Sequence, residues 1–561
     1  MLHTLAFRRS SIAALVVTVA ILPLAACTAS VTTEDGGGTA PTSTNYDDLV
    51  TLFKEWRDFE KPVLVDGVYD YTAAAMATQQ RELADYQARL AAIDSNGWPI
   101  AQQVDHYVVQ TEMNGLDFYH RVSRPWARNP AFYISIFSAE SDVPAHEGPV
   151  IHGWIDTWAY DYPLSPERAA ELAARIGAIP AVLEQARGNL AEDATDLWRM
   201  GIGAFEGQSA ALGRLAERVA GTSADLDAAI QEAIVASDEF AVWLEAELPS
   251  KNGPSGVGVD NYDWYMHNVH LVPYTWSEQL TMMRRELARS VASLKLEEHR
   301  NREIPEQERI ASAEDYDRLF NEAVTEYMDF LDGGDVYSVR EYDDFALRER
   351  IGRFSPAEGL RGFFSEVSYR DPLTMRTHGH HWFDLAMMEN EPHASEIRRV
   401  PLLYNIWDSR AEGMATGMEE WMMHAGLFDD SPQSRELIWI LVAQRAARAI
   451  GGLMMHGNEW TIQEAVDFAA EWTPRGYMPA DSDTVWFEQH FYLTQPGYGT
   501  SYLVGKQMIE QLMAERALQL GDEFTLEGFM DELHAAGLIP MSLISWELTG
   551  EKPDVLEGEV Q

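Results

Sequence analysis

The 561-residue chain contains a single cysteine, Cys27, and this scarcity excludes several kinds of chemistry. A lone cysteine cannot form a disulfide within the chain. The residues after Cys27 offer no thiol nucleophile for catalysis and no thiolate ligand for a metal ion. A reactive site in that part of the chain must therefore use other side chains.

Long apolar runs are missing as well. No apolar run of about 18 residues or more occurs, so we expect no membrane-spanning helix. The run Ile12–Leu24 is too short to cross a bilayer, which takes about 20 residues. It follows Arg8 and Arg9 and ends at Ala25-Ala26-Cys27, which is the order of a lipoprotein export signal. We predict that residues 1–26 are a cleaved signal peptide and that Cys27 carries the lipid; an ordinary signal peptide with an incidental cysteine is the alternative.

Basic residues are few, since 42 Lys and Arg face 89 Asp and Glu and give a formal net charge of −47. Such a charge repels nucleic acid and anionic lipid headgroups, so we expect no nucleic-acid partner and no membrane contact except through the lipid on Cys27. We interpret the excess of acidic residues as solvent-exposed faces of helices. The alternative is an acidic surface that binds a cationic partner. The body is expected to be exported and lipid-anchored to a bacterial membrane. Thr28 after the cysteine favours the outer membrane, and the oligomeric state stays open.

The composition divides the exported chain into parts. Residues 27–45 are small and polar and predict a flexible tether. The rest is longer than one hydrophobic core usually allows, which predicts two lobes. Proline and glycine cluster within residues 249–262. We therefore expect an N-terminal helical lobe at 46–255 and a C-terminal helical lobe at 256–550 that carries the site.

Apolar residues recur three and four positions apart over much of the chain, which predicts amphipathic helices. Serine followed by proline at Ser165 and Ser355, and a capping box at Thr461, mark helix starts. Only Ala131–Phe137 has the pattern of a strand. The expected fold is all-α, a bilobal helical bundle around a cleft, with at most a small β element near residues 131–137. The clearest helical segments are residues 72–93, 165–194, 223–248, 277–300 and 313–331.

Histidine and carboxylate side chains concentrate between residues 370 and 505, which we expect to form the floor of the cleft. His378, His380 and His381 lie within four positions, and histidine with glutamate is a ligand set for zinc or another divalent ion. Hydrogen-bonded core histidines are the alternative. On a helix, His378 and His381 project to the same side, whereas in an extended segment His378 and His380 share a face.

A predicted helix at 409–425 follows, with Glu412 and Glu419 on one stripe. Glu412 is a candidate metal ligand, or it pairs with Arg410 or Arg445. Glycines in a helix interior cost about 1 kcal/mol each relative to alanine, so Gly413 and Gly417 indicate the close approach of another backbone.

The next predicted helix, Arg435–His456, is strongly apolar, which indicates that it is buried. Buried arginines need carboxylate partners, so Arg445 and Arg448 are expected to pair with glutamates, or Arg448 acts as a charge clamp. His456 faces a cleft or caps this helix. The Gly-rich entry at 495–505 brings the hydroxyls of Tyr498 or Tyr502 toward a ligand, or is a plain helix connection.

Several of these segments together resemble a known family, the bacterial domain of unknown function 885, whose members look like zinc-dependent peptidases. The resemblance spans most of residues 50–548 in order and spacing. It implies a peptide or other small-molecule substrate and a bound zinc or another divalent ion. The matching stretches are Leu164–Leu190, Gly379-His380-His381, Ala411-Glu412-Gly413, Arg448–Trp460, Gln495–Gly505 and Gly521–Leu543.

The usual signature of that family, H-E-x-x-P-G-H-H, is incomplete in this chain. When Gly379-His380-His381 is aligned with its end, Thr374 and Met375 stand where the metal-binding histidine and the water-activating glutamate are expected. The downstream acid and the helix-end histidine are present as Glu412 and His456. The chain is thus predicted to be a divergent member.

Three functions fit these observations. We favour a divergent metallohydrolase acting on peptides or related amides, because the many polar groups from Arg376 to His393 would serve no purpose in an inactive groove. The alternatives are a metal-independent enzyme that uses histidine and arginine for acid–base chemistry, and a ligand-binding lipoprotein that has lost the chemistry. The expected metal ligands are His378, His380, His381 and Glu412, and the expected catalytic residues are Glu419, His456, Arg448 and Tyr502.

Overall fold

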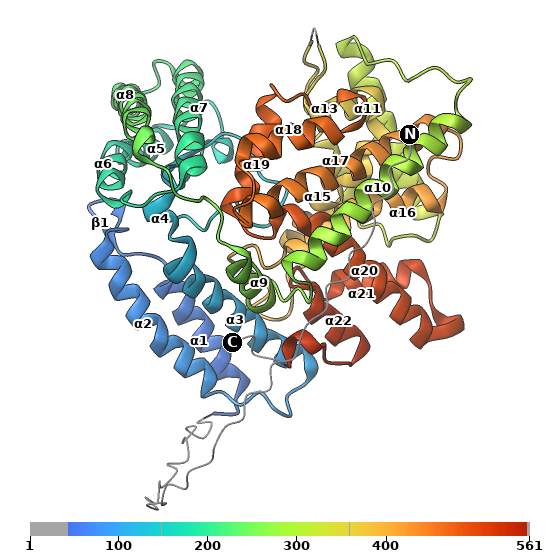
Figure 1. Ribbon diagram of the computed structural model, residues 1–561, viewed down its shortest axis with the longest axis horizontal. Coiled ribbons are helices and arrows are strands. Elements are labelled where there is room, and N and C mark those ends of the chain that lie inside the picture. The colour runs from blue at the N-terminus through green and yellow to red at the C-terminus, as the bar shows by residue number, and fades with distance from the viewer. Residues whose placement is uncertain (1–42, 147, 358, 558–561) are drawn as a thin grey trace, which may run out of the picture. The chain divides into compact units, whose positions relative to one another are not determined.

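The structure is a computed structural model that describes residues 43–146, 148–357 and 359–557. The predicted signal peptide and Cys27 lie outside these residues. About 68% of the structure is helical and its only sheets are two of two strands each within the described residues, which confirms the predicted all-α class (Figure 1).

Local signals explain where several helices begin. The pattern at 72–93 forms α2 (Ala73–Ala91), and Ser165 caps α5 (Pro166–Ile176) by accepting a hydrogen bond from the amide of Arg168. Thr461 and Glu464 form the predicted capping box of α18 (Ile462–Trp472). These caps satisfy amides that a helix start would otherwise leave without partners.

Two local predictions are wrong. Ser355 starts no helix, because its amide donates to the hydroxyl of Tyr369 and its carbonyl accepts from Arg361, so side chains replace helical hydrogen bonds. Most of Ala131–Phe137 is not a strand, because Asn129 caps a short 3-10 helix at Pro130–Tyr133. Within this segment only β3 (Ile136–Phe137) forms a strand, and it pairs in parallel with β4 (Ile155–Asp156).

The remaining elements follow in chain order. The first half contains α1 (Tyr46–Phe59), β1 (Leu64–Val65), β2 (Val68–Tyr69), α3 (Ile100–Phe118), α4 (Pro125–Arg128), α6 (Ile179–Asn189), α7 (Thr195–Val219), α8 (Ala224–Glu247) and α9 (Val259–Asn268). The second half contains α10 (Trp276–Arg300), α11 (Ala313–Gly333), α12 (Asp343–Arg348), α13 (Phe363–Arg370), α14 (Pro372–His378), α15 (His380–Asn390), α16 (Asp408–Ala425), α17 (Pro432–His456), α19 (Asp483–Thr494), α20 (Tyr498–Leu520), α21 (Leu526–Ala535) and α22 (Met541–Thr549).

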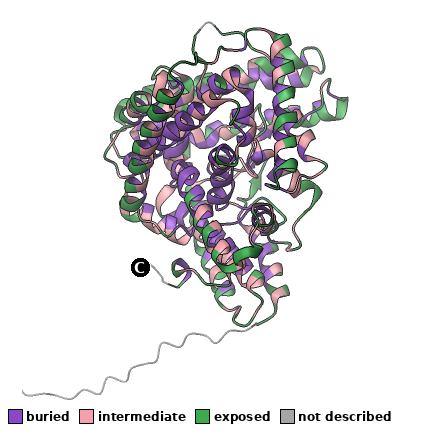
Figure 2. Ribbon diagram, turned by 90° about the vertical axis from the view of Figure 1, so that its right-hand side faces the viewer, coloured by how far each residue is buried: buried purple, intermediate pink, exposed green. Residues whose placement is uncertain are grey.

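Helices α16, α17 and α20 form the centre of the core, and nearly all residues of α16 and α17 are buried. Figure 2 shows that buried residues gather in the interior and exposed residues at the periphery. The close approach predicted at Gly413 is confirmed, since a Cβ there would lie 2.4 Å from the carbonyl carbon of Gly505 on α20. Gly417 instead faces the indole of Trp421. Among the described helices, α17 alone is long and apolar enough to cross a membrane, and its apolar window is completely buried, as in a core helix.

The segment where we expected a lobe boundary is itself packed against the C-terminal half. The amide of Gly256 donates to Asn458 Oδ1 at 3.0 Å, and a Cβ on Gly256 would lie 2.2 Å from the carbonyl oxygen of Met455. The described residues belong to one compact unit. The division into two lobes stays a prediction.

Candidate functional site

His378 and His381 lie on either side of a break between two short helices. Asp371 caps α14, which ends at His378, and Gly379 separates it from α15, which begins at His380. A Cβ on Gly379 would lie 2.6 Å from Leu347 Cδ2, so a side chain there would require Leu347 to shift. The two imidazole rings are 5.0 Å apart between centroids. The two rings thus lie next to each other, as the sequence predicted for a helical segment, although Gly379 interrupts the helix between them.

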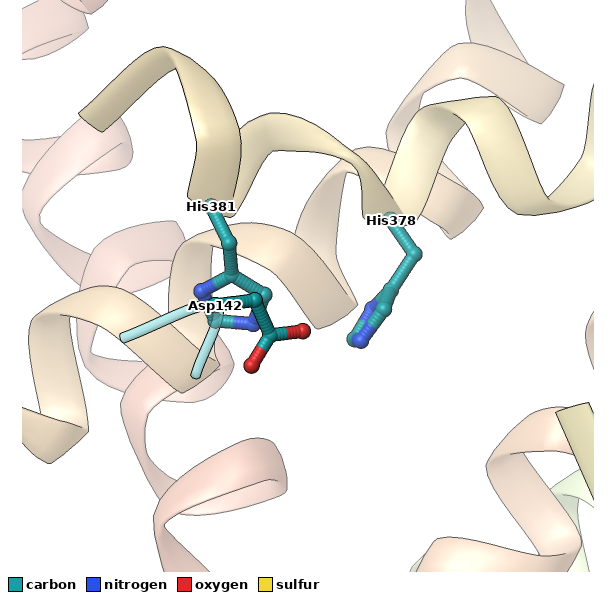
Figure 3. Close-up of side chains that lie close together, drawn as sticks. All are labelled: Asp142, His378 and His381. Carbon is teal, nitrogen blue, oxygen red and sulfur yellow. The ribbon is translucent and has the colours of Figure 1, made fainter. Parts of the chain in front are cut away.

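Asp142 completes a group of possible metal ligands with these two histidines (Figure 3). It comes from the irregular segment between β3 and β4. One ligand atom from each residue lies within 4.8 Å of the other two. Atoms that bind one zinc ion at about 2.0–2.2 Å lie within about 4.4 Å of one another, so the group is close to the size that a metal ion requires. Sequence reasoning missed Asp142, because nothing in its surroundings marks it as a ligand.

Each of the two imidazoles also has a buried glutamate beside it. His378 Nδ1 lies 3.1 Å from Glu419 Oε1, and His381 Nε2 lies 3.3 Å from Glu412 Oε2. Both glutamates come from α16, on the stripe that the sequence predicted. Glu412 also accepts a hydrogen bond from the hydroxyl of Tyr498. It pairs with neither Arg410 nor Arg445.

Arg445 balances the charge of Glu419. Its guanidinium makes two hydrogen bonds to that carboxylate, at 2.6 and 2.7 Å, and both side chains are fully buried. Burial by itself raises the pKa of Glu419, but Arg445 and His378 together hold it below the ordinary value. The sequence predicted that buried arginines of α17 pair with glutamates. The pair of Arg445 with Glu419 confirms this for Arg445.

The charges around His381 make it strongly basic. Burial lowers its pKa, but the carboxylates of Glu412 and Asp142 outweigh this and raise the pKa to about 9. The same ion pair holds the pKa of the Glu412 carboxyl below its ordinary value, although burial opposes this. The site therefore stabilises positive charge between its carboxylates.

His380 points away from this group into a second cluster with Asp384 and His534. Its Nε2 lies 2.7 Å from His534 Nε2, and Arg410 holds Asp384 through hydrogen bonds of 3.0 and 3.2 Å. Burial first, and then nearby positive charge, lowers the pKa of His380 and brings that of His534 to about 4. The structure thus does not bring all three predicted histidine ligands together.

The other predicted residues lie at different places around α17. His456 Nε2 lies 2.9 Å from the carbonyl oxygen of Tyr492, and burial lowers its pKa to about 4. Arg448 forms an ion pair with Glu488. The ring of Tyr502 lies near both arginines, with its centroid 5.7 Å from Arg445 Cζ and 5.8 Å from Arg448 Cζ. Arg448 and Tyr502 therefore border the group around His378, whereas no contact links His456 to it among the described residues.

Comparison with known proteins identifies relatives but no activity. The model of a family of bacterial proteins of unknown function, DUF885, matches residues 61–335 and 378–548. A protein of unknown function from Shewanella oneidensis, described as a candidate lipoprotein, has a similar fold, with a TM-score of 0.65, 16% identity, and coverage of 90% of this chain and 98% of that one. A candidate lipoprotein from Colwellia psychrerythraea gives a TM-score of 0.61, 15% identity, and coverage of 90% and 97%. No curated protein matches.

Proposed function

Since the chain belongs to the DUF885 family, we propose that it is an exported, lipid-anchored and divergent metallohydrolase that acts on peptides or related amides. One observation carries this proposal: His378 and His381 converge with Asp142, and each histidine has a buried glutamate beside it. Zinc sites commonly combine histidine ligands with such carboxylate partners.

The residues present fit a divalent ion. Histidine and carboxylate are ligands for zinc and related metals, and three protein ligands leave a coordination position open. In this proposal Glu412 and Glu419 do not bind the ion. They hold one nitrogen of each imidazole and so orient the other nitrogen for binding, as the carboxylate partners of ligating histidines do in other zinc sites.

A divalent ion held there would act as a Lewis acid and lower the pKa of a bound water. The chain's own residues supply the surroundings. Glu419, which the sequence suggested as a catalytic residue, is poorly suited to act as a general base, because Arg445 occupies both of its oxygens. Glu412 has the hydroxyl of Tyr498 and the ring of His381 as partners, and these fix the orientation of its carboxylate.

The metal content of the purified chain after dialysis tests this function. We expect about one divalent ion per chain and hydrolysis of small peptides that a chelator abolishes. His378→Ala should lose both, whereas His424→Ala, which alters a histidine whose side chain is 62% exposed, should keep both. If no ion is found, and if His378→Ala and the parent chain melt at the same temperature with and without chelator, the metallohydrolase is excluded.

Lipid attachment at Cys27 is supported by the export signal and by the two similar proteins described as candidate lipoproteins. Labelling with radioactive palmitate checks it. The parent chain should take up label and fractionate with the membrane, and Cys27→Ser should do neither, because a serine at this position cannot carry the lipid.

A second candidate function, a ligand-binding lipoprotein, is favoured by a different part of the chain. A cavity of about 740 Å³ lies between the β1–β2 hairpin, the segment 150–154 and α6, and aromatic and aliphatic side chains line most of it. Its size is within the range of small-molecule sites, about 300–1,000 Å³. Binding of an apolar small molecule by a chain without metal or hydrolytic activity would favour this function.

A further inference from the structure

Arg448 is completely buried in the middle of α17, yet only one of its nitrogens is paired. Its Nη1 donates to Glu488, whose side chain is 16% exposed. Three aromatic rings surround the guanidinium, with centroids 5.1 Å (Phe363), 5.4 Å (Tyr492) and 5.8 Å (Tyr502) from Cζ. Aromatic faces attract the positive charge, but they do not replace an oxygen acceptor for the N–H groups.

The unpaired donors of Arg448 are Nε and Nη2, which have no hydrogen-bond partner among the described residues. These two nitrogens form one edge of the planar guanidinium. That edge binds both oxygens of a carboxylate through parallel hydrogen bonds. A buried donor without a partner costs about 1–3 kcal/mol, so two on one edge indicate that an acceptor belongs there.

The guanidinium of Arg448 lies one aromatic ring away from the arginine that borders the proposed metal site. Arg448 and Arg445 share the ring of Tyr502, and Arg445 Nη2 lies 3.3 Å from His378 Nδ1. One aromatic side chain therefore separates the guanidinium of Arg448 from the one that contacts a metal-binding histidine. A short substrate can span such a distance.

We propose that the Nε and Nη2 edge of Arg448 binds the free carboxylate at the end of the substrate, so that the substrates are short chains with a free C-terminus. Arg448 is then a specificity-determining residue that positions the chain end. Glu488 offsets the charge of Arg448, so the paired hydrogen bonds and the positive charge that remains both favour a carboxylate. The proposal rests on the proposed function for the reaction, but the binding step does not require the metal.

Calorimetric titration of the full mature chain with trialanine and with trialanine amide tests the proposal. The two probes differ only at the C-terminus, and the acid should bind at least about tenfold more tightly, because a charged pair of hydrogen bonds is lost in the amide. Arg448→Lys keeps the charge but lacks the edge and should abolish this preference. Arg435→Lys, on the same helix and paired with Glu297, is the matched control and should keep it.

A second variant works in the opposite direction, in case Arg448→Lys does not fold. Glu488→Gln removes the negative charge beside the guanidinium and should strengthen the preference for the acid. Equal binding of acid and amide by the parent chain, or no binding of either, overturns the proposal, and so does a preference that Glu488→Gln leaves unchanged.

Chelator treatment separates this proposal from the proposed function. If the preference for the acid survives in chelator while no metal or hydrolysis is found, the metallohydrolase fails and the carboxylate site stands. If metal and hydrolysis are present but acid and amide behave alike, only the carboxylate site fails.

Discussion

His380 and His381 are neighbours in the chain but belong to two different histidine clusters. The surroundings of the two clusters differ in charge and exposure. Around His378 and His381 lie three carboxylates and one arginine, Arg445, and the His378 side chain is 13% exposed. Around His380 and His534, Arg410 balances Asp384 and every side chain is buried. An excess of carboxylate favours a cation, whereas a balanced pair leaves the histidines neutral. Histidine spacing alone does not distinguish a metal site from a structural cluster.

The largest expected effect breaks the balanced cluster. Asp384→Asn leaves Arg410 buried without a carboxylate, which should lower the free energy of unfolding by about 3–5 kcal/mol. Urea unfolding in the presence of chelator measures this, with metal content determined in parallel on the folded variant. An unchanged urea midpoint would contradict the structural role, and loss of metal from a folded Asp384→Asn chain would contradict the division into two clusters.

A smaller effect sharpens the comparison, because the two clusters should respond to pH in opposite directions in chelated protein. The folded pKa of His534 is lowered from 6.5 to about 4. Its contribution to the free energy of unfolding is therefore present above pH 6.5 and is lost as the pH falls toward 4. The folded pKa of His381 is raised from 6.5 to about 9. Its contribution to the free energy of unfolding is therefore present below pH 6.5 and is lost as the pH rises through 9. Each shift corresponds to about 3 kcal/mol.

Unfolding free energies at a series of pH values measure both contributions. His534→Gln should flatten the profile on the acid side only, and His381→Gln on the alkaline side only. His424→Gln should change neither side. Variants that flatten the profile on the same side would show that the two clusters do not differ in charge as described.

The smallest expected effect concerns the glutamate beside His381. Glu412→Gln keeps the shape of the side chain but removes the negative charge, so metal affinity should fall by about 10- to 100-fold without complete loss. Competition with a fluorescent chelator gives the affinity. A complete loss equal to that of His378→Ala would indicate that Glu412 itself binds the metal, as the sequence suggested.

Much of this arrangement could be predicted from the sequence, because helical periodicity determines it. The direction of a side chain follows its position along a helix, which placed Glu412 and Glu419 on one stripe. For the histidines the sequence left a helical and an extended geometry open and kept all three as ligands. The burial of α17 and the pairing of Arg445 with a glutamate followed from its apolar composition.

The missing parts come from regions without periodicity. Asp142 lies on an irregular segment, and His534 belongs to a helix far along the chain, so only the tertiary fold brings them to the histidines. The choice of Asp384 for Arg410, and of Glu419 for Arg445, depends on how the helices cross. The strand expected at Ala131–Phe137 forms only at Ile136–Phe137, because Asn129 and Pro130 form a local cap that competes with extended backbone before it.

The contact between Gly413 and Gly505 has a consequence for how the site can open. The backbones of α16 and α20 are in direct contact where they cross. No side chain lies between them there, so a change of rotamer cannot move the two helices apart. Glu412 and Tyr498, which these helices carry, should therefore move as one body. Asp142 is outside that body.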